Sequence, residues 1–430
     1  MLERLFGLRA HGTTVTTEVM AGATTFLTMA YILFVNPAIL ADAGMDKGAV
    51  FVATCLAAAF GSLAMGVLAN YPIALAPGMG INAYFAYSVV IGMGKPWTVA
   101  LGAVFVSGVL FLALSVTRLR DAIFDAIPAS LKMAISAGIG LFLGLIALEH
   151  AGVVVAHPVT LVTLGDLSRP APLLAAAGFL AMVVLDAWRV PGALMIGILG
   201  VTAAGMALGL APVGGIVALP PSLAPTFLKM DVRGALDLGV ATIVFAFLFV
   251  DLFDNAGTLI GLAHRGGLLD AQGRLPRLGR ALIADSLAAM ASAVFGTSTT
   301  TSYIESAAGI KAGGRTGLTA AVVAVLFLAA LFLSPLAAAI PPYATAPALL
   351  FVACLMVRGL AEIAWDDSTE AVPAVLAALV MPLTFSIAHG IGIGFIAYGA
   401  IKLLTGRARE AGPVVLLLAA AFVAKYAWLG

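Results

Sequence analysis

The chain has 430 residues, of which 62% are hydrophobic and 10% charged, and its mean hydropathy is +1.11. Ordinary globular domains carry about 25% charged residues, so this composition excludes an ordinary soluble domain. The net charge of +1 gives no sign of nucleic-acid binding, and the two cysteines, Cys55 and Cys354, lie in apolar runs that suggest neither a metal site nor a disulfide.

Apolar runs of about 20 residues, the length that crosses a bilayer, recur along the chain. The polar segment 1–14 precedes a first run without an obvious small-residue cleavage site, so we expect a retained span rather than a signal peptide. A last run, about 413–428, is short, and we expect it to pack against the others or to lie at the interface. The sequence thus predicts an all-α polytopic membrane protein, with fourteen segments at about 16–40, 49–69, 73–93, 97–117, 130–150, 171–187, 191–211, 238–262, 279–295, 298–311, 316–338, 342–358, 371–388 and 390–405.

The basic residues indicate the orientation, because cytoplasmic loops carry an excess of Lys and Arg. With the N-terminus in the cytoplasm and fourteen crossings, sixteen of the 22 Lys and Arg residues fall inside and five outside, with Lys425 unassigned. Removing either of the weakest spans, 298–311 or 342–358, would place the later basic loops on the wrong side. We therefore expect fourteen crossings of the cytoplasmic (inner) membrane.

The third and tenth runs do not read as continuous helices. The third, NYPIALAPGMGINAYFAY over 70–87, contains prolines and glycines that break a helix. The tenth, FGTSTTTSYIESAAGI over 295–310, opens with a Thr/Ser run that favours extended structure and ends in a helix-like half. Such backbone is tolerated at membrane depth only where protein or a cavity covers it. We expect a short extended stretch and a half-helix in each run.

The two halves of the chain resemble each other. FVNPAIL over 34–40 matches FDNAGTL over 253–259 at an offset of 219, and Asn82 of GINAYF matches Glu305 of YIESAA at an offset of 223. Because seven spans per unit is an odd number, the two copies must be inverted in the membrane. In such seven-plus-seven repeats the broken helices meet near the midplane and form the binding site.

Two acidic residues lie near the middle of the eighth run. Charge at that depth costs on the order of 3 kcal/mol and usually faces the protein interior, where it serves a substrate or ion path. Asp251 and Asp254 are three apart, so on a helix they share one face. We expect this face to form half of a substrate and proton site, and Glu305, Ser306 and Asn82 to form the other half.

Four stretches together resemble the AzgA-like purine permeases, a branch of the nucleobase permeases related to uracil permease and the nucleobase–ascorbate transporters. They are TTEVMAGATTFLTMAYILFVNP, APGMGINAYF, VDLFDNAGTL and TSTTTSYIESAAGI, in this order, and the resemblance covers nearly the whole chain. It implies proton symport of purine bases such as hypoxanthine, adenine and guanine. It also implies a homodimer in the lipid bilayer and no cofactor other than the coupling proton.

The resemblance further implies a core domain of segments 1–4 and 8–11 and a gate domain of segments 5–7 and 12–14. Short strands are implied in segments 3 and 10, and the homodimer forms through the gate. The core is expected to carry the bound base across while the gate stays in place. The implied parts are an N-terminus (1–15), the first core half (16–126), the first gate half (127–211), a loop (212–237), the second core half (238–338), the second gate half (339–405) and a C-terminal helix (406–430).

Carried over by position, the family's acidic residues of segment 8 fall on Asp251 and Asp254, that of segment 10 on Glu305, and the asparagine of segment 3 on Asn82. Asn255 departs from the family pattern, in which we expect threonine after Asp254, and this departure bears on selectivity among purines. The predicted substrate-binding set is Asp251, Asp254, Asn255, Glu305, Ser306, Asn82, Ala83, Thr25 and Phe26.

The chemistry of a purine fits these groups. A base is flat and neutral, and its edges carry donors and acceptors that a carboxylate and an asparagine amide can satisfy. Three carboxyls in one dry site cannot all stay ionised, so one of them should bind the coupled proton. We expect Glu305 to hold the base and Asp251 or Asp254 to carry the proton, while Phe26 or Tyr84 covers a face of the ring.

Plainer interpretations of these residues stay open at this stage. Asp251 and Asp254 would also fit a structural pair satisfied by neighbouring helices. Glu305 would fit a helix N-cap, and Asn82 a capping or turn residue. Thr25 would fit a threonine that bonds the backbone of its own helix.

Other functions also stay open. A carrier of another planar base, such as uracil or xanthine, is the first alternative. A sulfate-type anion carrier on the same architecture is less favoured, because it predicts a positive or carboxylate-poor site. A membrane enzyme would need a nucleophile–base set or metal ligands within the spans, and no span contains an HExxH motif or a His/Asp cluster.

Overall fold

The computed structural model describes residues 2–117, 127–213, 215–237, 239–269 and 275–428, apart from a few side chains within α12 and at the end of α20. The elements of the first half are α1 (Leu2–Phe6), α2 (Val15–Met29), α3 (Ile32–Asp42), α4 (Lys47–Ala64), η1 (Met65–Ala69), β1 (Leu75–Pro77), α5 (Met79–Ala83), η2 (Tyr84–Gly92), α6 (Trp97–Val116), α8 (Ala129–His150), β2 (Val154–His157), β3 (Leu161–Leu164), α9 (Pro170–Ala187) and α10 (Ala193–Ala207). Those of the second half are α11 (Val232–Ala235), α12 (Ala241–Gly266), α13 (Leu278–Phe295), β4 (Thr300–Ser302), α14 (Ser306–Lys311), α15 (Gly317–Ala330), η3 (Leu331–Leu333), α16 (Ser334–Ala339), α17 (Pro342–Val357), η4 (Arg358–Glu362), α18 (Ser368–Leu383), α19 (Ile387–Leu404) and α20 (Ala408–Trp428).

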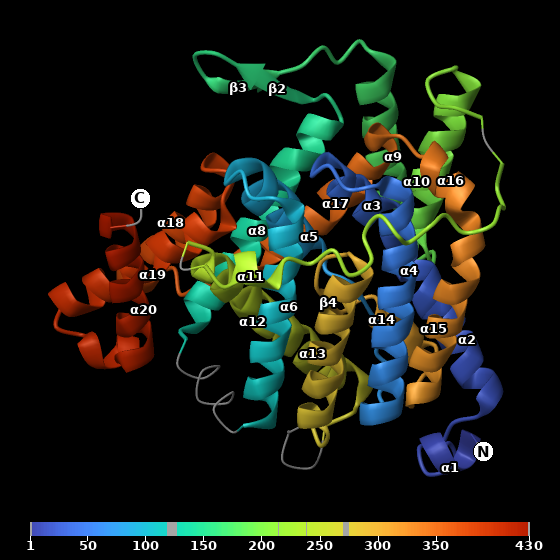
Figure 1. The fold of residues 1–430 in the computed structure, drawn as a ribbon, viewed down its shortest axis with the longest axis horizontal. Coiled ribbons are helices and arrows are strands. Elements are labelled where there is room, and N and C mark those ends of the chain that lie inside the picture. The colour runs from blue at the N-terminus through green and yellow to red at the C-terminus, as the bar shows by residue number, and fades with distance from the viewer. Residues whose placement is uncertain (1, 118–126, 214, 238, 270–274, 429–430) are drawn as a thin grey trace.

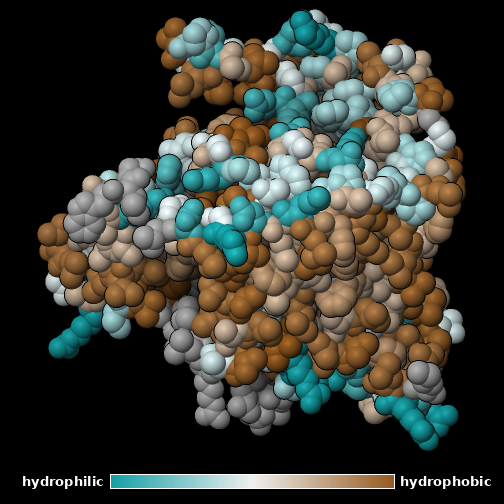
Figure 2. Space-filling model, in the orientation of Figure 1, coloured by the Kyte–Doolittle hydropathy of each residue, from teal (hydrophilic) through white to brown (hydrophobic). Residues whose placement is uncertain are grey.

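Eleven helices in the described part of the chain are long and apolar enough to cross a membrane. Ten of them, three shorter apolar helices and the broken segment made of β4 and α14 correspond to the fourteen predicted segments. Figure 2 shows a broad hydrophobic band between polar ends, as expected of a surface that faces lipid. The predicted polytopic membrane protein is confirmed, while the kind of membrane and the side of the N-terminus stay predictions.

The two halves place the same elements in the same order, which is the predicted seven-plus-seven repeat. In each half, helices flank a short strand with a half-helix, β1–α5 in one and β4–α14 in the other, and three further apolar helices follow, α8, α9 and α10 in one and α17, α18 and α19 in the other. The helices pack in two groups (Figure 1): α2, α4, α6, α12, α13, α14 and α15 in one, and α8, α9, α10, α17, α18 and α19 in the other. The core and gate bounds given above stay a prediction.

The strands β1 and β4 come from opposite halves of the chain and pair antiparallel, with Leu75 opposite Ser302. Backbone bonds continue the pairing on both sides, from Tyr303 N to Ala74 O at 2.9 Å and from Gly78 N to Thr299 O at 3.0 Å. The predicted strands of segments 3 and 10 are therefore confirmed. Because the strands run in opposite directions, the half-helices that follow them, α5 and α14, leave the pair toward opposite sides.

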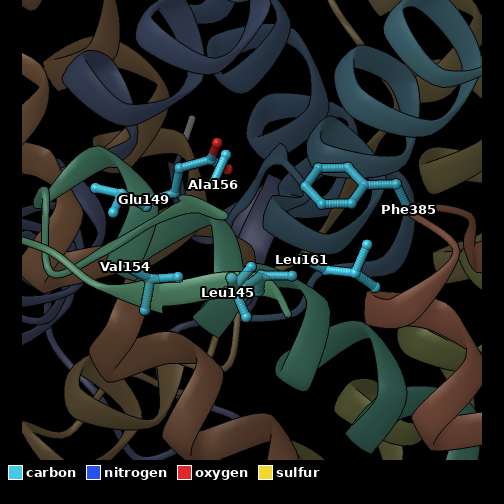
Figure 3. A pocket seen from close by; sticks show the side chains of 8 residues that line it. Leu145, Glu149, Val154, Ala156, Leu161 and Phe385 are labelled. Atoms are coloured by element: carbon cyan, nitrogen blue, oxygen red, sulfur yellow. The ribbon is translucent and has the colours of Figure 1, made fainter. Parts of the chain in front are cut away.

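A second strand pair, β2 and β3, was not expected from the sequence. It forms a hairpin after α8, with Val154 opposite Leu164, from two short Val/Thr-rich stretches around a turn that contains a proline. Figure 3 shows a hollow between this hairpin, the end of α8 and the ring of Phe385. The hollow is lined mostly by apolar side chains, with Glu149 beside them, and none of the predicted site residues lines it.

The C-terminal helix α20 is tied to α18 and α19 by a cluster of charges around the buried Lys402. The Lys402 ammonium has no exposed surface and lies 2.8 Å from both Glu370 and Glu410. Beside it, Arg407 pairs with Asp367 at 2.8 Å, and this contact holds the pKa of the Asp367 carboxyl below its usual value. A buried ammonium needs such partners, so these contacts fix the start of α20 on the group of helices that contains α18 and α19.

Not every buried acid of the spans faces a substrate path. Glu18 of α2 is fully buried, and its carboxylate accepts hydrogen bonds from Arg315 N at 2.9 Å, Thr316 N at 3.3 Å and the Thr319 hydroxyl at 2.6 Å. These groups lie just before and within the first turn of α15, where unpaired N–H groups and the helix dipole favour an anion. Glu18 therefore joins α2 to α15 as a structural acid.

Candidate functional site

One face of α12 is directed toward the strand pair. Phe247, Asp251 and Asn255 are spaced four apart, so they share that face. At one end the Phe247 ring packs edge-on against Tyr84 of η2, with ring centroids 4.9 Å apart. At the other end Asn255 Oδ1 accepts a hydrogen bond from the Ser302 backbone N–H of β4 at 3.0 Å. Asp251, which is 2% exposed, therefore lies between η2 and β4 in a site closed to solvent.

Asn82 lies in α5, directly after β1, and is fully buried. The Ser298 hydroxyl donates a hydrogen bond to its Oδ1, so its side chain contacts the other half of the chain. Its Nδ2 donor has no hydrogen-bond partner in the described part of the chain. The next residue, Ala83, is also fully buried and ends α5. Asn82 thus presents a buried donor, unpaired among the described residues, at the junction of the two halves.

Glu305 occupies the residue before α14, but its carboxylate makes no capping bond to that helix. The Tyr31 hydroxyl instead donates to Glu305 Oε1 at 2.6 Å, a length typical of a hydrogen bond to a charged oxygen. Tyr31 is 1% exposed and lies at the break between α2 and α3. The neighbouring Ser306 hydroxyl accepts from Ala74 N at 3.0 Å, which fastens the start of α14 to the segment before β1.

The two candidates on α2 have different surroundings. Thr25 is fully buried against α14, and a Cβ added at Gly309 would collide with its hydroxyl. Glycine at this position therefore allows α2 and α14 to approach closely. Phe26 packs edge-on against Phe327 of α15, with ring centroids 5.1 Å apart. Of the two rings proposed to cover a base, Tyr84 is the one that contacts the α12 face bearing Asp251.

The sequence interpretation missed two residues at this site. Asp285 of α13 is fully buried and accepts a hydrogen bond from Asn255 Nδ2. An acid in the ninth apolar run is the signal that should have identified it, because buried intramembrane acids need a specific partner. Tyr31 carried no comparable signal, since its bond to Glu305 joins residues far apart in the chain. The Asp254 side chain lies outside the described residues.

The site therefore collects polar groups from both halves within an apolar bundle. Asp251 and Asn255 come from α12, Asn82 from α5, and Glu305 and Ser306 from the start of α14. The helix α12 contacts β4, α5 and α14, the elements that carry or adjoin the other polar groups. Carboxyl oxygens and an unused amide donor are suited to a neutral ligand with both donors and acceptors at its edge.

The family profile described as "Permease family" (Xan_ur_permease) matches residues 16–393. The chain belongs to this permease family. The match ends within α19, so α20 lies beyond it. The putative permease MJ0326 of Methanocaldococcus jannaschii is 52% identical to this permease over 429 residues, covering 100% of this chain and 98% of the relative. The resemblance stated from the four sequence stretches is confirmed, and the permease is a transport protein rather than an enzyme.

Two further relatives carry more specific names. The adenine permease AdeP of Escherichia coli K12 is 49% identical and covers 100% of this permease and 96% of its own chain. The guanine/hypoxanthine permease PbuG of Bacillus subtilis 168 is 47% identical and covers 97% of this permease and 98% of its own chain. The alignments extend over nearly the full length of each protein, so they include all the segments that form the candidate site.

Solved structures support the architecture. The transmembrane domain of the cyanobacterial bicarbonate transporter BicA superposes with a TM-score of 0.65 at 18% identity, covering 88% of the permease and 96% of that chain. Murine Slc26a9, an anion transporter, superposes with a TM-score of 0.66 at 11% identity, covering 91% of the permease and 68% of that chain. At such identities the likeness concerns the fold alone, so the substrate has to be argued from the site.

Proposed function

We propose that this permease imports purine nucleobases together with protons across the cytoplasmic membrane. The relatives named as adenine and guanine/hypoxanthine permeases support a purine as substrate. The observation that carries the proposal is the buried Asn82 Nδ2, a donor without a partner among the described side chains, in the half-helix α5. A buried polar group left unpaired costs about 1–3 kcal/mol, which a ligand acceptor at this position would recover.

The acidic groups favour a base over an anion. Ring N–H groups of a purine can donate to the Glu305 or Asp251 carboxylate, while its ring nitrogens or 6-oxo group accept from Asn82. An anion bound here would instead lie beside the buried Asp251 carboxyl and the half-buried Glu305 carboxyl, and like charges repel strongly where little water screens them. The anion transporters among the structural neighbours therefore share the fold of this permease, and its site calls for a neutral ligand.

Proton coupling follows from the same carboxyls. Ionised Asp251 and Glu305 in one water-poor site repel each other, so binding a proton on one of them makes it easier for the other to hold the base. We assign the proton to Asp251 or Asp254 and the base to Glu305. The two helix groups support an elevator-type movement, in which the group containing α12 carries the site past the group containing α8. A homodimer through the latter group belongs to the same proposal.

A substrate panel tests the proposal directly. The purified permease is reconstituted in liposomes, and uptake of labelled hypoxanthine is measured at two external pH values with uracil, xanthine, adenine, guanine and sulfate as competitors. We expect adenine and guanine to compete and uptake to rise at the lower external pH. Competition by uracil or xanthine alone would assign another base, and competition by sulfate would overturn a nucleobase as substrate.

The Tyr31–Glu305 bond gives a first prediction. Tyr31→Phe removes the hydroxyl that fixes Glu305 Oε1 while keeping the ring that fills the break between α2 and α3. We expect the KM for hypoxanthine to rise about fivefold, because one hydrogen bond to a charged group contributes on the order of 1 kcal/mol or more. Initial uptake rates over a range of hypoxanthine concentrations measure this. Tyr398→Phe, which removes a hydroxyl bonded to Glu370 at 2.7 Å away from the site, is the matched control.

A further inference from the structure

Two asparagines occupy equivalent positions in the internal repeat. Asn36 belongs to FVNPAIL and Asn255 to FDNAGTL, the two stretches that match at an offset of 219. Asn36 lies on α3 and Asn255 on α12, and both are fully buried. A buried side-chain amide must find partners within the protein or in a ligand, so the bonds of each asparagine indicate its role.

Asn36 joins its own half of the chain to the other half. Its Nδ2 donates to Thr54 Oγ1 of α4 at 2.7 Å and to Thr297 Oγ1, just before β4, at 2.8 Å. The Thr54 hydroxyl donates its own hydrogen to Val50 O at 2.6 Å, so its oxygen is free to accept from Asn36. Both N–H donors of Asn36 are therefore used, one within the first repeat and one on the strand segment of the second.

Asn255 bonds the same segment at its other end. Its Oδ1 accepts the Ser302 N–H at 3.0 Å, and its Nδ2 donates to Asp285 of α13. The amide thus uses its acceptor on the strand and a donor on a neighbouring helix. This pattern matches that of Asn36, in which one bond reaches the 297–302 segment and the other reaches a helix of the same repeat.

The segment between these two anchors leads directly to the proposed site. Ser298 donates to Asn82, Thr299 O accepts from Gly78 N, and the Tyr303 hydroxyl donates to Pro77 O at 2.6 Å. Glu305 follows two residues later. A displacement at either end of 297–302 would therefore move Asn82 and Glu305 relative to each other.

The partner strand β1 is held differently. The Ser62 hydroxyl of α4 donates to Leu75 O and accepts from Leu75 N, both at 3.0 Å. Ser62 and Asp285 are separated by 223 residues, the offset that also relates Asn82 to Glu305. In the first repeat Ser62 bonds β1 directly. In the second repeat Asp285 is linked to β4 through Asn255. The strand that precedes Glu305 is thus anchored by an asparagine of each repeat, whereas β1 is bonded by Ser62 of its own repeat in addition to its contacts with β4 and Tyr303.

We infer that Asn36 and Asn255 are paired positioning residues, which hold the two ends of segment 297–302 and thereby set the geometry in which Asn82 and Glu305 receive the substrate. The inference rests on the proposed function in that the positioned ligand is a purine base. It assigns a role to Asn36, and it makes Asn255 a residue that acts on the substrate through β4 rather than by direct contact.

The Asn36–Thr297 bond provides the sharpest test, because threonine and valine have nearly the same shape. The full-length permease is reconstituted, and hypoxanthine uptake is measured per folded protein, quantified by size-exclusion chromatography. We expect Thr297→Val to raise the KM about tenfold, equivalent to about 1.4 kcal/mol, with Vmax changed less than twofold. Thr297→Ser, which keeps the hydroxyl, should restore the wild-type KM. A KM unchanged in Thr297→Val, with only yield or Vmax reduced, would show a merely structural bond and overturn the inference.

A double-mutant cycle tests whether the effect passes through Asn36. Asn36→Ala should raise the KM at least as much as Thr297→Val, and the double variant should be no worse than Asn36→Ala, because both changes remove the same bond. Additive effects would overturn the coupling. Thr202→Val on α10 is the control, since it makes the same substitution at a buried threonine whose hydroxyl bonds Ile198 O of its own helix at 2.8 Å.

The positioning role of Asn255 is tested by comparing the KM values of different bases. Asn255→Ala should raise the KM for hypoxanthine and adenine by similar factors, about tenfold or more, since loss of a strand anchor affects every base alike. A change confined to one base would show direct contact with the ligand and overturn the positioning role. Failure of wild type to take up any purine would overturn the proposed function and this inference together. Normal wild-type uptake with unaltered KM in Thr297→Val would overturn the inference alone.

Discussion

Asp251→Asn is expected to abolish accumulation of purine against its gradient. Exchange of purine between the two sides of the membrane should remain intact. Asp251 is 2% exposed and lies between η2 and β4, where a charged carboxylate has little water to stabilise it. Asparagine resembles the protonated acid in size and polarity but cannot release a proton. The variant should therefore bind the base and carry it across the membrane without the coupled proton.

The size of this effect follows from the driving force. One charge moved through 100 mV releases about 2.3 kcal/mol, which sustains roughly a fortyfold concentration ratio. In liposomes with an imposed potential and pH gradient, wild type should approach such a ratio for labelled hypoxanthine, and Asp251→Asn should stop near one. Counterflow should persist in the variant. Asp186→Asn, which makes the same change at an exposed position of α9, should accumulate as wild type does. Concentrative uptake in Asp251→Asn would exclude Asp251 as the sole proton carrier.

Glu305→Gln should have a different and equally large effect, the loss of binding itself. Glutamine keeps the length of the side chain but lacks the charge, and hydrogen bonds to a charged acceptor contribute about 1.5–3 kcal/mol. The Tyr31 hydroxyl, which donates to Glu305 Oε1, would also lose its charged partner. We expect hypoxanthine affinity to fall roughly 10- to 140-fold, measured by equilibrium binding to the detergent-solubilised permease.

The two acidic variants separate the two roles. Glu305→Gln should lose both binding and counterflow, whereas Asp251→Asn should keep both and lose only accumulation. Glu362→Gln, an exposed change in η4, controls for the substitution itself. If Glu305→Gln bound hypoxanthine as wild type does while Asp251→Asn failed to bind, the roles assigned to the two carboxyls would have to be exchanged.

The sequence predicts the broken segments well because the signals that break a helix are local. Pro72, Pro77 and Gly78 mark the entry to α5, and the Thr/Ser run marks β4, so both strands and half-helices are found where expected. Burial of Asp251 follows from the apolar run around it. The hairpin β2–β3 was missed because its short strands lie between the predicted segments 130–150 and 171–187, where no regular element was expected.

The contacts within the site are less predictable, because they join distant parts of the chain. Tyr31 bonds Glu305 across 274 positions and Asn36 bonds Thr297 across 261, and no periodic pattern links either pair. The sequence assigned Asn255 to the site only by its place in the family pattern. Its bonds to Ser302 and Asp285 depend on how α12, β4 and α13 pack together. Residue type and depth indicate that a group is important, whereas its partner depends on the three-dimensional fold.

The origin of β1 and β4 in opposite halves has a consequence for biosynthesis. Chain elongation on the ribosome delivers β1 to the bilayer long before β4 exists, so the binding site cannot assemble until the second half has been inserted. Unpaired backbone groups are costly in lipid, and Ser62 satisfies both the N–H and the carbonyl of Leu75 from within the first half. This local bond would protect the waiting strand during translation, and separately expressed halves should form a working transporter only when both are present in the same membrane.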